Sequence, residues 1–104
     1  PEAPELCAID VSFISLKLIL GPVFGVMARG GLVIALLKPQ FELSPGDLNR
    51  GIVKTEELRL KALEDMRAFL KQNLPGAEEL GVMDSTIKGA KGNLEFLWLL
   101  KKNK

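Results

Sequence analysis

The fold of this 104-residue chain is decided by one stretch, Leu32-Val33-Ile34-Ala35-Leu36-Leu37-Lys38-Pro39-Gln40-Phe41. Six consecutive apolar residues are typical of a buried strand that is covered on both faces. Pro39 cannot donate to a strand ladder, so we expect the strand at 32–37 to stop at Lys38-Pro39. A polar residue at the carboxyl end of a buried strand lies where open α/β sheets bind their ligands. The stretch therefore predicts an α/β sheet with Lys38 at its functional edge.

The residues before this strand predict a second strand and a helix. A short apolar run at 6–11 is typical of a buried strand, and Ser12 or Ser15 can cap a helix that has Pro22 near its end. The Arg-Gly-Gly sequence at 29–31 favours a turn. A strand, a helix and a strand in this order predict a parallel pairing of the two strands.

The residues after it predict a long loop, a helix and two strands. Residues 42–54 are rich in proline and glycine and predict a loop of the length that functional loops often have. Thr55 caps the clearest helix of the sequence, which Pro-Gly at 75–76 ends. Strands at 80–83 and 94–100 would close the sheet as a hairpin. The fold class is thus α/β, with mostly parallel strands and an antiparallel last strand.

Composition excludes several classes of site. The chain has no histidine, which excludes Ser-His-Asp and Cys-His catalysis and most catalytic zinc centres. Cys7 is the only cysteine; in its apolar run it predicts a buried, inert thiol and fits a reducing cytosol. The net charge of +1 does not indicate a nucleic-acid partner, although residues 88–104 hold five lysines and one acid. Charges and glycines interrupt the apolar region 11–37, so we expect no membrane span.

Three charged residues interrupt segments that otherwise read as buried: Asp10, Lys38 and Glu95. Buried charges must be paired, so an acid, a base and an acid at neighbouring strand ends are electrostatically consistent. Spacing alone favours a structural ion cluster over a catalytic one. The residue types leave both interpretations open.

Four blocks of sequence carry a resemblance that bears on this choice. They are Asp-Val-Ser-Phe-Ile-Ser-Leu at 10–16, Ala-Leu-Leu-Lys-Pro-Gln-Phe-Glu at 35–42, Gly-Ile-Val at 51–53 and Ile-Lys-Gly-Ala-Lys-Gly-Asn-Leu-Glu-Phe-Leu at 87–97. In this order they resemble the hemolysin A/TlyA family, whose members are related to FtsJ-type RNA 2′-O-methyltransferases. The resemblance implies that residues 1–104 are the C-terminal part of a Rossmann-like methyltransferase domain. The half that carries the cofactor loop, and an S4-like RNA-binding module, have no counterpart in this sequence.

The resemblance also implies a catalytic role for the three charged residues. The superfamily has a Lys-Asp-Lys-Glu tetrad, whose last three members would be Asp10, Lys38 and Glu95. Lys38 would accept or orient the proton of a ribose 2′-hydroxyl, and the two carboxylates would position its amine. The first lysine of the tetrad has no counterpart here, so we expect the chain alone to be inactive.

Cofactor and partners follow from the same resemblance. S-adenosylmethionine would be the cofactor, contacted by Asp10, Ser12 and Phe13. Ribosomal RNA or a ribosomal subunit, in the cytoplasm, would be the partner. A set of basic residues on the loop and on the late glycine-rich turn would bind the RNA, unless they are ordinary solvated charges: Arg50, Lys54, Lys88 and Lys91.

Several alternatives remain open at this stage. The chain could be a non-catalytic RNA-binding or structural fragment, a membrane-active hemolysin, or part of a methyltransferase that modifies bases. If the strand at 6–11 lacks a sheet neighbour, its exposed edge favours a homodimer through that strand.

Overall fold

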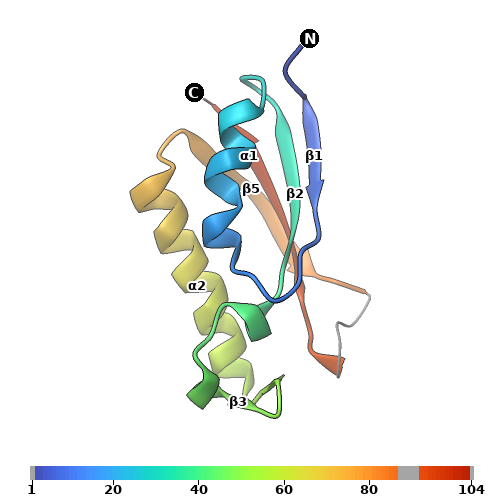
Figure 1. Cartoon of the computed structure of the whole chain (residues 1–104), viewed down its shortest axis with the longest axis vertical. Coiled ribbons are helices and arrows are strands. Elements are labelled where there is room, and N and C mark those ends of the chain that lie inside the picture. Colours follow the sequence, from blue (N-terminus) through green and yellow to red (C-terminus); the bar gives the residue numbers. More distant parts are fainter. Residues whose placement is uncertain (1, 87–91, 104) are drawn as a thin grey trace.

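The computed structural model describes residues 2–86 and 92–103, which form a mixed four-stranded sheet with two helices on one face (Figure 1). The order of the strands across the sheet is β1 (Leu6–Ile9), β2 (Leu32–Leu37), β6 (Phe96–Lys102) and β5 (Ala77–Asp84). The helices are α1 (Leu20–Val26) and α2 (Glu56–Asn73). The predicted α/β class is confirmed.

The directions of the strands fit the expected arrangement, with one refinement. β1 and β2 are parallel, and β6 is antiparallel to both β2 and β5. Three strands therefore run one way and the last strand runs the other. Because β6 lies between β2 and β5, however, only the β1–β2 ladder is parallel among the described strands.

The core lies between the helices and one face of the sheet. The alternate residues Val33, Ala35 and Leu37 of β2 are fully buried, as are Trp98 and Leu100 of β6. From α1 and α2 they meet a set of apolar side chains: Leu20, Phe24, Leu63, Met66 and Leu70. The period of two in the strands and of three to four in the helices directs these side chains to one shared layer.

The opposite face of the sheet has no covering element among the described residues, which corrects the expectation for β2. Ile34 is 39% exposed and Met83 is 63% exposed. A shallow hollow of about 360 Å³ lies on this face, lined by Ile34, Gly81, Val82, Met83, Leu97, Trp98 and Leu99. An apolar run therefore reports the composition of a strand, but not which element covers its second face.

β1 is shorter and more exposed than its sequence predicts. It ends at Ile9 instead of residue 11, and Leu6 is 62% exposed. Cys7, expected to be buried, is only partly buried. The exposure of Leu6 and Cys7 has one cause: among the described strands, β1 lies at the edge of a sheet with one open face.

The first helical segment begins where expected but is built differently. Ser15 Oγ accepts a 3.0 Å hydrogen bond from Lys17 N and starts the 3-10 turn η1 (Leu16–Leu18). Pro22 lies in the first turn of α1 and not near its end, which corrects the prediction. A proline is tolerated there because first-turn N–H groups have no partner within the helix.

The other end of α1 is stabilised from β6. Lys102 Nζ donates to the carbonyl oxygens of Phe24 (2.6 Å) and Met27 (2.8 Å). These carbonyls lack partners within the helix, and a cation suits the negative end of the helix dipole. β6 itself begins and ends two residues later than the predicted 94–100, because its last residue, Lys102, still pairs with Ala77 of β5.

Residues 42–54 are more ordered than a loop. After the 3-10 turn η2 (Pro39–Phe41) comes a second one, η3 (Pro45–Asp47). Strands β3 (Leu48–Asn49) and β4 (Ile52–Val53) then form a small hairpin. Its two turn residues have positive φ, 52° at Arg50 and 84° at Gly51, as two-residue hairpin turns require. The prediction of a long loop is wrong at this point.

α2 begins as predicted. Thr55 Oγ1 accepts a 3.1 Å hydrogen bond from Leu58 N, and Glu56 and Glu57 occupy the first turn. β5 is longer than the predicted 80–83, because its early residues pair with the extended end of β6, Ala77 with Lys102. Within the described ranges, none of the helices is both long and apolar enough to cross a membrane.

Candidate functional site

One edge of the sheet gathers the charged residues. The parallel strands β1 and β2 both end there, and the antiparallel β6 begins there. Leu37 pairs with Phe96, so Lys38 and Glu95 leave the sheet at the same point. Asp10 follows the last residue of β1. Topology alone therefore places the three predicted residues at one edge.

Asp10, Ser12 and Lys38 form a hydrogen-bonded cluster at this edge. Lys38 Nζ lies 2.5 Å from Asp10 Oδ1 and 3.1 Å from Ser12 Oγ. The side chain of Lys38 is 12% exposed, whereas that of Asp10 is 66% exposed. The amine is thus held from one side by two oxygen atoms, and the carboxylate faces solvent.

Glu95 belongs to the same edge but not to this cluster. Its side chain is buried (4% exposed), and Oε2 accepts a 2.8 Å hydrogen bond from Gln40 Nε2. Among the described residues, its carboxylate is bonded to Gln40 and not to Lys38. Gln40 is two residues after Lys38, so the two charged groups are linked through one short turn of chain.

Phe13 has an unusual conformation beside the cluster. Its φ is +65°, which is rare for a bulky residue, and its side chain is 90% exposed. The ring lies 5.1 Å from that of Phe41, at an interplanar angle of 50°. A strained backbone that presents an aromatic ring to solvent is typical of a binding site.

Glu42 ties the loop after β1 to the loop after β2. Its Oε1 accepts from Ser15 Oγ at 2.5 Å, and its Oε2 accepts from Leu16 N at 2.8 Å. Burial raises the pKa of the Glu42 carboxyl group, although the hydrogen bond from Ser15 opposes the rise. This link fixes the segment that carries Asp10, Ser12 and Phe13 relative to Lys38.

The predicted RNA-binding residues lie partly in the described region. Arg50 is exposed at the tip of the β3–β4 hairpin, and exposed Lys54 donates from Nζ to the carbonyl of Gly46 at 2.9 Å. Asn93 joins the hairpin to the start of β6: its Nδ2 donates to Gly51 O at 2.9 Å, and its Oδ1 accepts from Val53 N at 3.0 Å. Lys88 and Lys91 lie outside the described residues.

Sequence reasoning missed four residues that build this edge: Gln40, Glu42, Arg59 and Asn93. Arg59 is 5% exposed and donates from Nε to Leu94 O, next to Glu95. Three of the four lie inside or beside the quoted sequence blocks, so their position there was a usable signal. For Arg59 the only signal was a cation one helical turn after the cap of α2.

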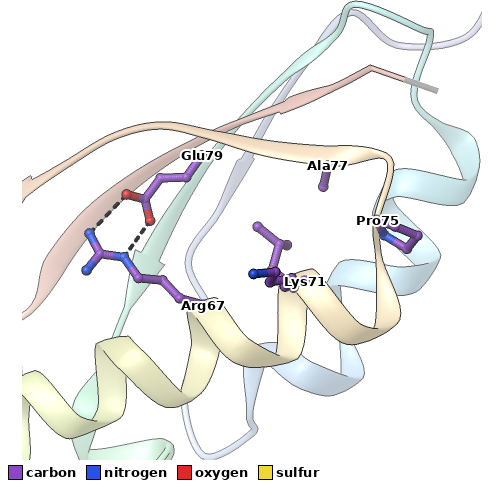
Figure 2. A pocket seen from close by; sticks show the side chains of 6 residues that line it. Arg67, Lys71, Pro75, Ala77 and Glu79 are labelled. Atoms are coloured by element: carbon purple, nitrogen blue, oxygen red, sulfur yellow. Dashed lines mark hydrogen bonds and ion pairs between the residues drawn. The ribbon is translucent and has the colours of Figure 1, made fainter.

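A second hollow, of about 360 Å³, lies at the other end of α2 and β5 (Figure 2). Arg67 and Lys71 line it, with Glu79 and Ala77 from the strand opposite. Arg67 is already engaged there: its Nε and Nη2 each donate to Glu79 at 2.9 Å. Ala77 begins β5, whereas Asp84 ends it at the charged edge. This hollow is therefore separate from the candidate site.

Comparison with known proteins assigns the chain to a family. No family model matches it. It is 39% identical over 97 residues to hemolysin A of Brachyspira hyodysenteriae, 39% identical over 95 residues to the candidate rRNA methyltransferase YqxC of Bacillus subtilis, and 37% identical over 97 residues to the 16S/23S rRNA (cytidine-2′-O)-methyltransferase TlyA of Mycobacterium tuberculosis. About 90% of the chain is matched by each of these relatives. This chain belongs to the hemolysin A/TlyA family.

Solved structures agree with this membership. A candidate hemolysin from Streptococcus thermophilus superimposes with a TM-score of 0.92 and 41% identity, and one from Lactococcus lactis with 0.90 and 38%. They are matched over 99% and 98% of this chain. An O-methyltransferase from Bacillus cereus has a TM-score of 0.56 at 12% identity, which shows that the fold is shared.

The chain matches only a part of each hemolysin A/TlyA relative. The chain spans 40% of hemolysin A, 33% of YqxC and 35% of TlyA. It spans 37% of the Streptococcus thermophilus chain and 49% of the Lactococcus lactis chain. The match to the Streptococcus thermophilus structure, over 99% of this chain, includes the charged edge.

Proposed function

We propose that the cluster of Asp10, Ser12 and Lys38 is the acceptor side of a site that transfers a methyl group from S-adenosylmethionine to a ribose 2′-hydroxyl of ribosomal RNA. The observation that carries the proposal is the nearly buried Lys38 amine, held by two oxygen acceptors at the carboxyl edge of the sheet. The relative TlyA, which is named for cytidine-2′-O methylation, supports the choice of reaction. A cytoplasmic site of action follows from this substrate.

The geometry of Lys38 suits a group that orients a hydroxyl. An ammonium has three N–H bonds, and two of them point to Asp10 and Ser12. The direction of the third is then fixed by the tetrahedral nitrogen. A ribose hydroxyl bound there would be held in one orientation, while the exposed carboxylate of Asp10 could receive its proton. Alignment and a nearby proton acceptor are what a weak hydroxyl nucleophile requires.

The residues fit one end of the cofactor. When bound, S-adenosylmethionine supplies a methyl group carried on a positively charged sulfonium. The Asp10 carboxylate complements that charge, and the exposed Phe13 ring can contact the cation through its face. The sequence holds no acidic-Gly-x-Gly loop for the adenosine and methionine ends. We therefore assign to this chain the acceptor side of the site only.

RNA contacts are proposed for the β3–β4 hairpin. Arg50 lies at its tip, Lys54 follows it, and Asn93 fixes it two residues from Glu95. A phosphate bound by these cations would lie beside the acceptor edge. Such binding should weaken as salt concentration rises. Lys88 and Lys91 remain candidates for the same surface on sequence alone.

The test is the Lys38→Ala variant of the intact native protein. We expect the rate of methyl transfer to fall about 100-fold or more, because the reacting hydroxyl loses the group that aligns it, with RNA affinity unchanged. Lys71→Ala is the matched control, because Lys71 is an exposed lysine on α2 at the other end of the molecule, and it should leave the rate unchanged. A normal rate for Lys38→Ala would contradict the proposal.

A further inference from the structure

We propose that Arg59 is a positioning residue for Glu95: one guanidinium holds the chain on both sides of that carboxylate. This inference rests on the proposed function and extends it to a residue of α2. Arg59 touches none of the residues of the Asp10–Ser12–Lys38 cluster through a described contact; it acts through the Leu94 carbonyl and the Phe96 ring, on either side of Glu95.

The contacts of Arg59 bracket Glu95. On the N-terminal side, Arg59 Nε donates to the carbonyl oxygen of Leu94 at 3.2 Å. On the C-terminal side, its Cζ lies 4.0 Å from the centre of the Phe96 ring, over the ring face. The two residues that flank Glu95 are therefore fixed by the same planar group. A rotation of the backbone at Glu95 would break one contact or the other.

Two carboxylates hold the guanidinium in place. Arg59 Nη1 lies 3.0 Å from Glu56 Oε2, and Nη2 is paired with Asp84 Oδ1. Arg59 is 5% exposed, and a buried cation requires such partners. Asp84 is the last residue of β5, and the next residue, Ser85, donates its N–H to Glu95 O at 2.7 Å. Arg59 and Ser85 thus constrain both carbonyls around Glu95.

Only arginine offers this combination of contacts. Its guanidinium is planar, so that the face can cover a ring while the edge donates several hydrogen bonds. A lysine at position 59 would keep the charge but could not contact Leu94, Phe96 and Asp84 together. The position of the Glu95 carboxylate beside Gln40 would then be less well defined.

The experiment is a double-mutant cycle in the intact native protein. Arg59→Lys and Glu95→Gln are made singly and together, and kcat and KM are measured for methyl transfer. We expect Arg59→Lys to lower kcat by about 10- to 100-fold, as small displacements of catalytic groups do, with KM changed by less than about twofold. In the Glu95→Gln background, Arg59→Lys should cause no further loss.

Two companion variants separate positioning from folding. Glu56→Gln removes the ion pair that lies within α2, three residues from Arg59, and keeps the contacts to Leu94, Phe96 and Asp84; it should change kcat by less than about threefold. Asp84→Asn weakens the hold on the guanidinium and should lower kcat only when Glu95 is present. Hydrogen exchange at the Ser85 amide should quicken in Arg59→Lys, since this amide bonds to Glu95 O.

The possible failures are distinguishable. If the losses from Arg59→Lys and Glu95→Gln multiply, or if the loss only follows the fraction of folded protein, Arg59 is structural and the inference is overturned. If Glu95→Gln itself retains the normal rate, Glu95 takes no part in methyl transfer and this inference is overturned. The proposed function is tested separately, by Lys38→Ala. If Arg59→Lys does not fold, the Asp84→Asn cycle decides by the same criterion.

Discussion

Gln40 and Glu95 are hydrogen-bonded in the interior although 55 residues separate them in the chain. Gln40 Nε2 donates to Glu95 Oε2 at 2.8 Å, and both side chains are less than a tenth exposed. A buried carboxylate needs a donor, and Gln40 supplies it from the residues that follow Lys38. This bond joins the segment that carries Lys38 to the segment that carries Glu95.

Gln40→Leu should impair both stability and methyl transfer. It removes the donor but keeps much of the volume, so Glu95 would be left buried without this partner. We expect the free energy of unfolding to fall by about 1–3 kcal/mol. The methylation rate should fall by about tenfold or more in the folded fraction. Urea unfolding and single-turnover kinetics measure the two effects, and Gln72→Leu, on the exposed surface of α2, is the control. Unchanged stability would mean that Glu95 finds another donor.

Glu42→Gln should alter how stability depends on pH. Burial raises the pKa of Glu42, so folding favours its protonated form. This stabilising contribution is present below the unfolded pKa of about 4.5 and is lost as pH rises through the folded pKa. Glutamine can accept from Leu16 N through its oxygen and donate from its amide nitrogen to Ser15 Oγ, so both contacts remain without the buried charge.

The measurement is the difference in unfolding free energy between Glu42→Gln and the native protein at pH 4 and pH 7. The variant should gain relative stability as pH rises. Glu5→Gln, at an exposed position, should show no such change. A difference that is constant with pH would contradict the role of Glu42 burial.

Glu79→Gln should show the opposite dependence. Hydrogen bonds from Arg67, and then from Trp98, lower the pKa of Glu79 against the effect of burial. Its stabilising contribution is therefore present above pH 4.5 and is lost as pH falls through the folded pKa. The Arg67 pair is partly exposed, so we expect a loss of only about 1 kcal/mol at pH 7, shrinking at pH 3. Thermal unfolding at the two pH values would show whether the loss instead persists in acid.

Dimerisation through β1 remains a prediction for the chain as given. β1 is an edge strand that pairs with β2 on one side only, among the described strands, and Leu6 is exposed on it. Unpaired strand edges favour pairing with a second copy. Light scattering should find dimers, and Ala8→Lys, which places a charge at an exposed edge position, should give monomers. A monodisperse native monomer would rule the prediction out.

Local features of the fold could be predicted because their causes are local. Thr55 caps α2 with its own side chain, and β2 has the predicted bounds because Pro39 follows it. The hairpin at 48–53 has a local signal in Gly51, because glycine readily adopts the positive φ that a two-residue turn needs. Exposure of β1 could not be foreseen, because it depends on which strand lies beside it and which element covers the sheet.

For the site, the sequence by itself singled out Asp10, Lys38 and Glu95 as candidates, through the order of its motif blocks. The same blocks indicated the methyltransferase family, which the comparisons with known proteins support. The tertiary structure decided which side chains contact each other. It places Lys38 against Asp10 and Ser12, and Glu95 against Gln40. It also places Arg59 against the two neighbours of Glu95. The physical reason is that a charged residue at the end of a strand can be recognised from its own segment of the sequence. The partner that compensates it comes from wherever the sheet brings another segment within hydrogen-bonding distance.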